Sequence, residues 1–389
     1  MKALAALLLV VPLAAQSSLE AARKLLAAGE AAKAIVMLRP IVAGEPTNAD
    51  ARIALGTALA LEGNRTESLV QLREAVRLRP DSAAGYNSLG MALSRFLETG
   101  PAREAFENAL RLDPNLAGAH VNLSMILAQS GAQDLALRHL NEAIRIESST
   151  PAAARPYYLR AEIHRERNEV EAARADLEQA VRLRPDYAAA WLELGVVRRA
   201  LLDEAGTLSA FQRAVELDPT DITAQLRLGS EYLHAGKPRE AIPHLQQAVN
   251  ADAGNRAALY NLERALREDG RIDEAKKVEA RMTALLAQRT KTSEFALEAS
   301  RLNNQGVELE KSGNLPAALA KYQAALDLDP EHEGFRLNLG LVLCRLGRWD
   351  EGIAQMREIV RRDPNNAEAV KALYAALDQK PKTPPTPER

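Results

Sequence analysis

Prolines recur along this chain at a fixed spacing, and that spacing constrains the fold more than any other feature of the sequence. Seven of them stand at residues 46, 80, 114, 185, 219, 330 and 364, so successive members of this set are separated by 34, 34, 71, 34, 111 and 34 residues. The two longer gaps equal two periods plus three residues and three periods plus nine residues. A sustained period of about 34 residues predicts an array of small structural repeats.

The sequence around each proline recurs with the same period. Placing each proline at position 32 of its repeat gives ten repeats, which start at residues 15, 49, 83, 117, 154, 188, 222, 256, 299 and 333. Position 8 is often glycine, as at Gly195, and positions 20 and 27 are often alanine. Such small residues let two helices cross closely, so a bulky residue at Gly195 should cost roughly 1–3 kcal/mol through overpacking.

Each repeat also holds two apolar stretches with helical spacing. In the second repeat, Leu55 and Leu59 form the first stretch, and Leu69 and Leu72 form the second. A glycine separates the stretches in most repeats, as Gly63 does here, and glycine accepts the left-handed backbone that ends a helix. Aromatic residues make up only 4% of the chain. The pattern therefore predicts an all-α protein with two helices in every repeat.

Large residues at two further positions complete a recognisable pattern. They are Tyr86, Tyr157 and Trp191 at position 4 and Phe106, Phe211 and Tyr322 at position 24. This pattern resembles the tetratricopeptide repeat family over nearly all of residues 15 to 379. The resemblance implies a right-handed α-solenoid of about ten tetratricopeptide-like helical hairpins with a C-terminal capping helix. Repeat 8 departs from it, with Glu263 at position 8 and Glu279 at position 24.

The domain organisation follows from the interruptions of the pattern. We expect a signal peptide over residues 1–15, repeats 1–8 over 16–289, repeats 9 and 10 with a capping helix over 290–379, and a disordered, proline-rich tail over 380–389. Nine additional residues, 290–298, precede repeat 9. Thr292 or Ser293 followed by Glu294 is typical of a helix start, so a bend or looser joint is expected there. In the capping helix, Val370 and Leu373 are expected to share an apolar stripe with Tyr374 and Leu377.

The first residues have the form of a secretory signal. Lys2 precedes an apolar run from Ala3 to Ala15 that Pro12 interrupts, and polar residues follow. Ala15 is small enough for cleavage by a signal peptidase, and the run is shorter than the roughly 20 residues of a membrane span. We therefore expect a secreted or periplasmic protein, cleaved near Ala15, with no membrane span after cleavage.

Composition and residue spacing argue against an active site. The formal charge is −2, so no overall field favours nucleic acid as a partner. Cys344 is the only cysteine and lies in a plain helical sequence, which argues against a nucleophile, a disulfide and a thiolate metal site. The six histidines form no metal-ligand spacing. We expect no catalytic residues, no metal and no cofactor.

Binding residues are predicted on the first helix of each repeat. In the family that this chain resembles, first helices line the inner, concave curve, and positions 2, 5, 6, 9, 12 and 13 face that curve. Asparagine or arginine on this face marks the predicted site, at Asn87, Asn122, Arg165, Arg199, Asn261, Asn303, Asn304 and Asn338. The asparagines are similar to the ladder in the repeat region of O-linked N-acetylglucosamine transferases, and an amide can bracket an extended peptide backbone. Asparagine is also an ordinary residue for an exposed helix, so the pattern leaves both interpretations open.

Two function classes remain. The first is a non-catalytic scaffold or adaptor that binds a protein or an extended peptide along the concave face, in the cell envelope. The alternative is the recognition subunit of an enzyme complex, such as a glycosyltransferase, whose catalytic domain belongs to another chain. An enzyme that uses the groove itself would require a cluster of titratable residues, which the sequence does not show.

Overall fold

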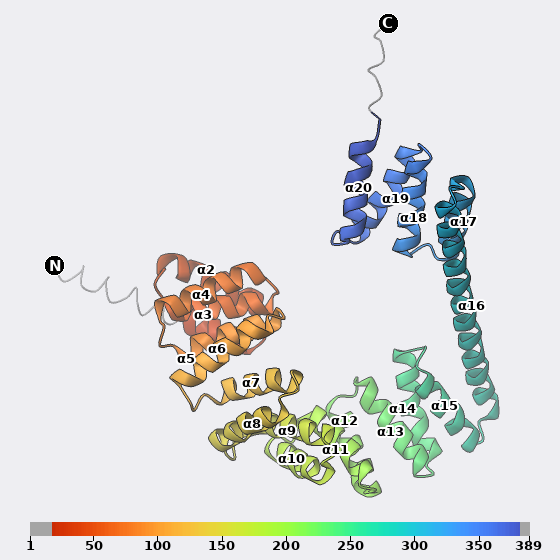
Figure 1. Cartoon of the computed structure of the whole chain (residues 1–389). Helices are drawn as coiled ribbons and strands as arrows, with labels where there is room; N and C mark the ends of the chain where they lie inside the picture. The colour runs from red at the N-terminus through yellow and green to blue at the C-terminus, as the bar shows by residue number, and fades with distance from the viewer. Residues whose placement is uncertain (1–17, 382–389) are drawn as a thin grey trace, which may run out of the picture. The chain divides into compact units, whose positions relative to one another are not determined.

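The computed structural model describes residues 18–381, and within that range the chain forms helices and no strand (Figure 1). The segments predicted as signal peptide, 1–15, and most of the predicted tail, 380–389, lie outside the described residues. The chain divides into two compact units, an N-terminal unit that ends at Ala251 and a C-terminal unit that begins at Asp252. Each unit is a succession of antiparallel helical hairpins, as predicted.

The first helices begin where the proline register places them. After a helical segment at 18–27, they are α3 (Ala49–Leu61), α5 (Ala83–Arg95), α7 (Ala117–Gln129), α9 (Ala154–Glu166), α11 (Ala188–Ala200), α13 (Ile222–His234), α15 (Arg256–Glu268) and α18 (Glu333–Arg345). Side chains at position 34 cap several of them, because Asn48, Ser82 and Asn255 each accept a hydrogen bond from a backbone N–H of the first turn. Local capping chemistry thus fixes these helix starts.

The second helices return antiparallel to the first. They are α2 (Ala31–Gly44), α4 (Arg65–Leu78), α6 (Thr99–Leu112), α8 (Gln133–Glu147), α10 (Val170–Leu183), α12 (Glu204–Leu217), α14 (Pro238–Ala251), α17 (Leu315–Leu328) and α19 (Trp349–Arg362). Where proline occupies position 32, the helix usually ends two residues before it, as at Leu78 before Pro80. Proline restricts the preceding residue to extended backbone, so the helix cannot continue. In repeat 4, Ser148 stands at that position with a φ of 47°, and the short 3₁₀ helix η1 (Pro151–Ala153) follows.

The turn within each hairpin uses a left-handed residue at position 15. Gly63 and six other glycines there have φ values between 67° and 81°, which confirms the predicted role of glycine. Three repeats place another residue in the same conformation, namely Leu97 at 62°, Asn168 at 61° and Leu202 at 60°. The side chains of Leu97 and Leu202 are 87% and 85% exposed, so packing does not compensate for their backbone conformation.

The core of each hairpin forms where the small positions meet the large residue at position 24. All alanines at positions 20 and 27 are at most 1% exposed. A Cβ atom added to Gly195 would lie 2.4 Å from Phe211, and one added to Gly90 would lie 2.6 Å from Phe106. The predicted close approach of paired helices is therefore present, and the glycines at position 8 permit it.

The C-terminal unit contains a helix that the repeat pattern does not predict. Helix α16 runs without a break over Ile272–Lys311 and serves as the second helix of repeat 8 and the first helix of repeat 9 (Figure 1). The expected helix start at Thr292 or Ser293 is therefore wrong, and the predicted boundary between residues 289 and 290 falls inside this helix. The physical reason is that neither glycine nor proline occurs between Gly270 and Gly306.

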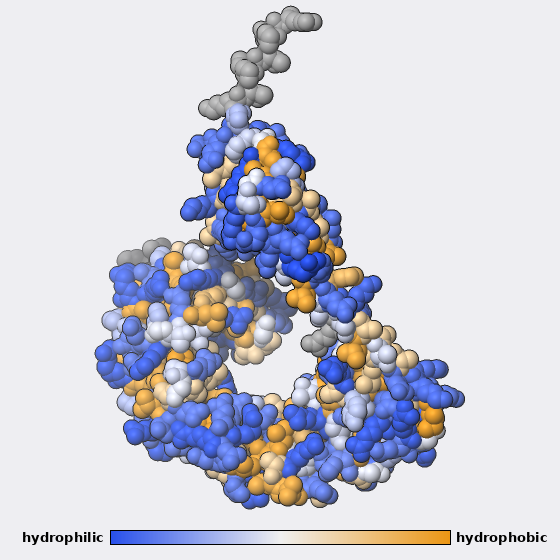
Figure 2. All heavy atoms as spheres, turned by 45° about the vertical axis from the view of Figure 1, so that its right-hand side comes forward, coloured by the Kyte–Doolittle hydropathy of each residue, from blue (hydrophilic) through white to orange (hydrophobic). Residues whose placement is uncertain are grey.

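The predicted capping helix is present as α20 (Ala367–Gln379) and packs on α19. Its buried face differs from the predicted stripe. Ala369 and Ala376 are buried and Leu373 is half-buried, whereas Tyr374 and Leu377 are 69% and 41% exposed. In the view of Figure 2, exposed hydrophobic residues are interspersed with hydrophilic ones.

Candidate functional site

The structure brings four of the predicted asparagines together in two pairs. Asn122 on α7 donates a hydrogen bond from Nδ2 to Oδ1 of Asn87 on α5, over 3.2 Å. Asn338 on α18 donates in the same way to Asn303 on α16, over 2.9 Å. In both pairs, position 6 of one repeat contacts position 5 of the repeat before it. We call the surface that the first helices form at these positions the first-helix face.

The other two predicted asparagines, Asn261 and Asn304, also lie on first helices of the repeats. Asn261 is half-buried on α15, and Asn304 is exposed on α16 beside Asn303. Asn87 also places its Nδ2 3.6 Å from Sδ of Met91, one turn further along α5. The predicted set therefore includes two ordered amide pairs, one in each compact unit, rather than a continuous ladder.

Both predicted arginines form ion pairs between successive first helices. Arg165 Nε on α9 lies 3.4 Å from a carboxylate oxygen of Glu193 on α11. Arg199 on α11 lies 3.5 Å from Glu231 on α13, whose side chain is almost completely buried. The arginine heads remain nearly half exposed, so they can still contact a ligand while the ion pairs hold them in place.

A partly buried acidic zone lies beside Arg165. Burial raises the pKa of the Glu162 carboxyl, although a hydrogen bond to Tyr158 opposes that shift. Burial, together with the charge of Glu162, raises the pKa of the Tyr158 hydroxyl. The Tyr158 ring packs against Tyr187 with 5.2 Å between ring centroids. Repeats 5 and 6 therefore present a fixed surface of aromatic, acidic and basic groups.

Position 4 has a role that size alone does not predict. Its side chain donates a hydrogen bond to the carbonyl oxygen of the proline six residues earlier in five repeats. The five contacts join Arg52 to Pro46, His120 to Pro114, Trp191 to Pro185, Gln225 to Pro219 and Arg336 to Pro330, over 2.6–3.0 Å. The shared feature is a side-chain N–H rather than a common shape, and each contact ties a turn between repeats to the helix that follows.

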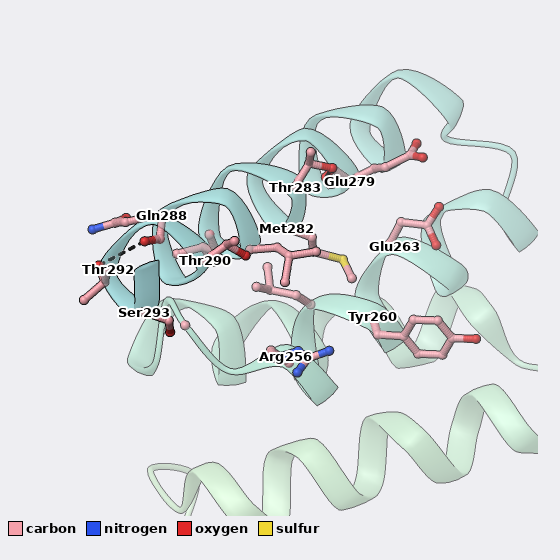
Figure 3. Close-up of a pocket in the computed structure, with 14 residues that line it drawn as sticks. Arg256, Tyr260, Glu263, Glu279, Met282, Thr283, Gln288, Thr290, Thr292 and Ser293 are labelled. Atoms are coloured by element: carbon pink, nitrogen blue, oxygen red, sulfur yellow. Dashed lines mark hydrogen bonds between the residues drawn. The ribbon is translucent and has the colours of Figure 1, made fainter. Parts of the chain in front are cut away.

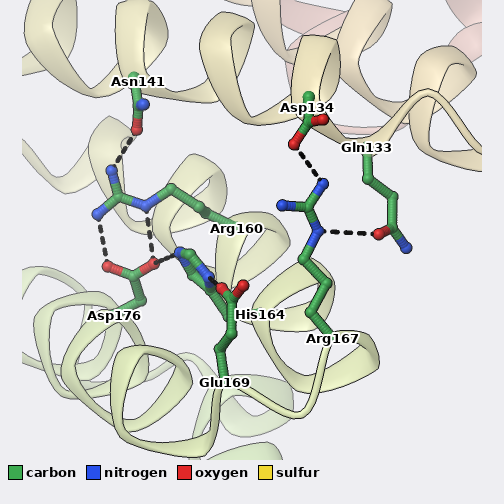
Figure 4. Close-up of polar contacts among 8 residues, drawn as sticks. All are labelled: Gln133, Asp134, Asn141, Arg160, His164, Arg167, Glu169 and Asp176. Atoms are coloured by element: carbon green, nitrogen blue, oxygen red, sulfur yellow. Dashed lines mark hydrogen bonds and ion pairs between the residues drawn. The ribbon is translucent and has the colours of Figure 1, made fainter.

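Several histidines also form side-chain contacts that hold the repeats together. His139 and His244, both at position 23, lie 2.9 Å from His120 and 2.7 Å from Gln225, so each contacts the position-4 residue of its own repeat. His164 lies within a polar network in which Arg160 forms two hydrogen bonds with the buried Asp176 (Figure 4). These contacts account for four of the six histidines as parts of the framework.

Within residues 18–381, no set of three or more histidine, cysteine, aspartate or glutamate side chains is placed to hold a metal ion. Cys344 is buried, its Sγ lies close to Gly352, and burial raises the pKa of its thiol. No helix in the described range combines the length and hydrophobicity that a bilayer span requires.

Comparison with known protein families agrees with this architecture. The family profile described as tetratricopeptide repeat matches residues 25–90, 232–291 and 309–377. The chain belongs to the tetratricopeptide repeat family. Two further profiles of tetratricopeptide repeats match residues 89–156 and 161–200, so the profiles together cover most of the array.

Individual relatives match only part of this tetratricopeptide protein. The TPR repeat-containing thioredoxin TTL4 of Arabidopsis thaliana is 28% identical over 31% of this chain and 16% of its own length. The peroxisomal targeting signal receptor of Komagataella phaffii is 25% identical over 45% of this chain and 30% of its own. The chain thus spans less than a third of either relative. A solved structure of PilF from Pseudomonas aeruginosa, 19% identical, aligns with a TM-score of 0.50 over 54% of this chain and 94% of that chain, which shows the fold alone.

Proposed function

We propose that this protein is a non-catalytic scaffold or adaptor that binds extended segments of other proteins along the first-helix face. The observation that carries the proposal is the recurrence of an ordered amide pair, Asn87 with Asn122 and Asn303 with Asn338. The pairs occupy equivalent positions in different parts of the array. All four asparagines are half-buried, so part of each amide remains accessible.

An amide pair of this geometry suits recognition of a peptide backbone. Each asparagine offers two N–H donors and one carbonyl acceptor. Asn122 uses one N–H to bond Asn87, so its carbonyl oxygen and second N–H can contact a backbone amide of a ligand. The bond within the pair also restrains both side chains before binding, which reduces the entropy that a ligand must overcome.

The surroundings of the pairs indicate which segments would bind. Near Asn87, the thioether of the exposed Met91 is polarizable and conformationally adaptable, so it accommodates varied apolar side chains. Further along the N-terminal unit, Arg165 and Arg199 alternate with Glu162 and Glu193. We infer that the face takes a segment with an apolar portion followed by charged residues of both signs.

One relative supports a binding role of this class. The peroxisomal targeting signal receptor is, by its name, a receptor for a targeting signal, and its match covers 45% of this chain. We further propose that the protein works in the cell envelope after export, because the first fifteen residues have the form of a secretory signal.

The test measures peptide binding by variants of the amide pairs. Peptides selected from a random library on the immobilised full chain are titrated against the purified protein by calorimetry. Replacing Asn122 and Asn338 with alanine should weaken binding roughly tenfold or more, since each hydrogen bond contributes about 0.5–1.5 kcal/mol. The matched control replaces the exposed Arg73 and Arg174 of second helices and should leave binding unchanged.

Two results would contradict the proposal. Equal binding by the asparagine variant and the wild type would show that the amide pairs do not contact the peptide. Loss of binding in the arginine control alone would place the interaction on the second helices. Turnover of a substrate by a stably associated second chain would instead favour a recognition subunit of an enzyme.

A further inference from the structure

The middle of helix α16 lacks the cover that the other junctions within each compact unit provide. At those junctions a second helix packs against the first helix of the next repeat, as Ala214 and Val215 of α12 pack against Ala224 and Leu228 of α13. At the junction of repeats 8 and 9 the two helices are one continuous helix, so they cannot pack on each other. Leu286, Phe295 and Leu297 are consequently 60%, 44% and 73% exposed.

The uncovered face contains a cleft between α15 and α16. Its volume is about 1060 Å³, and its apolar lining includes Leu259, Tyr260, Met282 and Leu286. In Figure 3 the Met282 side chain points into the space between the helices, with Glu263 and Glu279 at one end and Thr290 and Ser293 at the other. Residues 279–293 of α16 extend along about 21 Å of helix, which matches the length of the first helices that cover this face in other repeats.

The exposed stripe on α16 is symmetric about its own midpoint. Leu286, Thr290, Ser293 and Leu297 are separated by four, three and four residues, so they lie on one side of the helix. The two leucines lie at the ends, the two small hydroxyl residues lie inside, and none of the four is charged. An antiparallel helix with the same sequence would place leucine opposite leucine and the small residues opposite each other, where they permit close approach.

We propose that this face binds a second copy of the chain, with the α16 helices of the two copies antiparallel about a two-fold axis between residues 291 and 292. Leu286 of each copy then meets Leu297 of the other, and Thr290 meets Ser293. The segment 293–304 of one copy covers the cleft between α15 and α16 of the other. This segment includes the beginning of a first helix, so the second copy restores the cover that helix continuity removed.

The symmetry of the stripe favours a second copy over a foreign helix. A two-fold interface uses the same patch on both subunits, so its sequence must complement itself. A groove adapted to a different protein has no such requirement, and its apolar residues need not be placed symmetrically. The four stripe residues and the Asn87–Asn122 pair are different residues, so the two-fold contact can be tested separately from peptide binding at that pair. The covering segment 293–304 includes Asn303, so the Asn303–Asn338 pair lies at the edge of the proposed contact.

Sedimentation equilibrium of the full chain over a range of concentrations tests the proposal. Wild type should form a dimer, and Leu286→Glu should raise the dimer dissociation constant at least about a hundredfold, because both symmetry-related leucine contacts are lost. Leu97→Glu, a change at a leucine of the N-terminal unit that is even more exposed than Leu286, should leave the dimer intact. Helicity measured by circular dichroism should match wild type, and the thermal midpoints should agree at concentrations where both chains are monomeric, because residue 286 is mostly exposed.

A charge-complementation experiment separates self-association from other occupants. Chains carrying only Leu286→Glu or only Leu297→Lys should each dimerise poorly, but their mixture should form a heterodimer in which the introduced carboxylate of one chain faces the introduced ammonium of the other. Residues 286 and 297 are eleven positions apart on one helix and cannot contact each other within a chain. Recovery of the dimer in the mixture therefore requires contact between two chains. Three results would each overturn the proposal. The wild-type chain could stay monomeric, the mixture of the two variants could stay monomeric, or a stripe variant could lose only the binding of a foreign helical partner.

Discussion

Replacing Gly195 with alanine should destabilise the N-terminal unit although alanine favours helices. The new Cβ atom would lie 2.4 Å from Cε1 and 2.5 Å from Cδ1 of Phe211. Ordinary carbon contacts are about 3.5–4.0 Å, so the ring must retreat by about 1 Å. Phe211 is completely buried, so the ring can retreat only if neighbouring side chains also move.

The magnitude follows from two opposing terms. Overpacking of a filled core costs about 1–3 kcal/mol, and the higher helix propensity of alanine offsets up to about 1 kcal/mol of that cost. A net loss of roughly 1–2 kcal/mol should lower the midpoint of thermal unfolding by about 2–8 °C for a unit of this size. Hydrogen exchange of the α11 and α12 amides should accelerate correspondingly, which locates the effect in this hairpin.

Repeat 5 supplies an internal comparison for the same prediction. Its positions 8 and 24 are Ala161 and Leu177, and both are at most 2% exposed. The double variant Gly195→Ala with Phe211→Leu copies that pair, so the second change should recover stability that the first one removes. A double-mutant cycle should give a favourable coupling energy of about 0.5–3 kcal/mol. Additive effects, or a single alanine variant as stable as wild type, would refute the steric explanation.

Three other measurements test separate parts of the structure. Leu202→Gly should raise the free energy of unfolding by roughly 0.5–1 kcal/mol in denaturant titrations, because its φ of 60° is unfavourable for leucine and its side chain is exposed; an unchanged or lower value would contradict this account. Burial and then the charge of His120 lower the pKa of His139 below its usual 6.5, so the unfolded chain binds more protons just below that pH. The contribution of His139 is therefore present above pH 6.5 and lost as the pH falls toward the folded pKa. His139→Gln, which copies Gln71 and Gln355 at position 23, should lose less stability than wild type on acidification, and identical pH profiles would count against the pair. Finally, expression of the whole chain should give a product shortened near Ala15 outside the cytoplasm, whereas a full-length cytosolic product would argue against export.

The helix boundaries were predictable wherever local chemistry marks them. The register derived from seven prolines places the first residue of α3, α5, α7 and α9 correctly. Proline at position 32 ends one helix, and the capping residue at position 34 begins the next. Both helix boundaries are therefore determined by residues within one three-residue segment. The packing inside each hairpin was predictable as well, because helices that cross closely require small residues where they meet. These are glycine at position 8 and alanine at positions 20 and 27.

The predicted helix start within residues 290–298 is wrong because the local chemistry that marks the other helix boundaries is missing there. The register requires a break between repeats 8 and 9, but that break has no glycine or proline to produce it. In the absence of such a signal, backbone hydrogen bonds continue through the added residues, and Thr292 uses its hydroxyl to bond Gln288 within the helix instead of capping a new one.

The candidate site was predictable as a face but not as a set of contacts. Spacing placed Asn87 and Asn122 at neighbouring positions, yet their hydrogen bond depends on the offset between successive first helices, which a single repeat does not contain. The donors at position 4 were missed for a different reason. Arginine, histidine, tryptophan and glutamine share no size or charge, and only their common N–H becomes visible beside a proline carbonyl.

The shared helix α16 determines how the chain can be divided for experiments. A cut at residue 289 or 290, where the repeat pattern places the boundary, severs this continuous helix within the stripe that contains Leu286 and Leu297. A cut after Ala251 falls at the end of α14 and leaves every helix whole. Fragment boundaries for this protein should therefore follow helix continuity rather than repeat number.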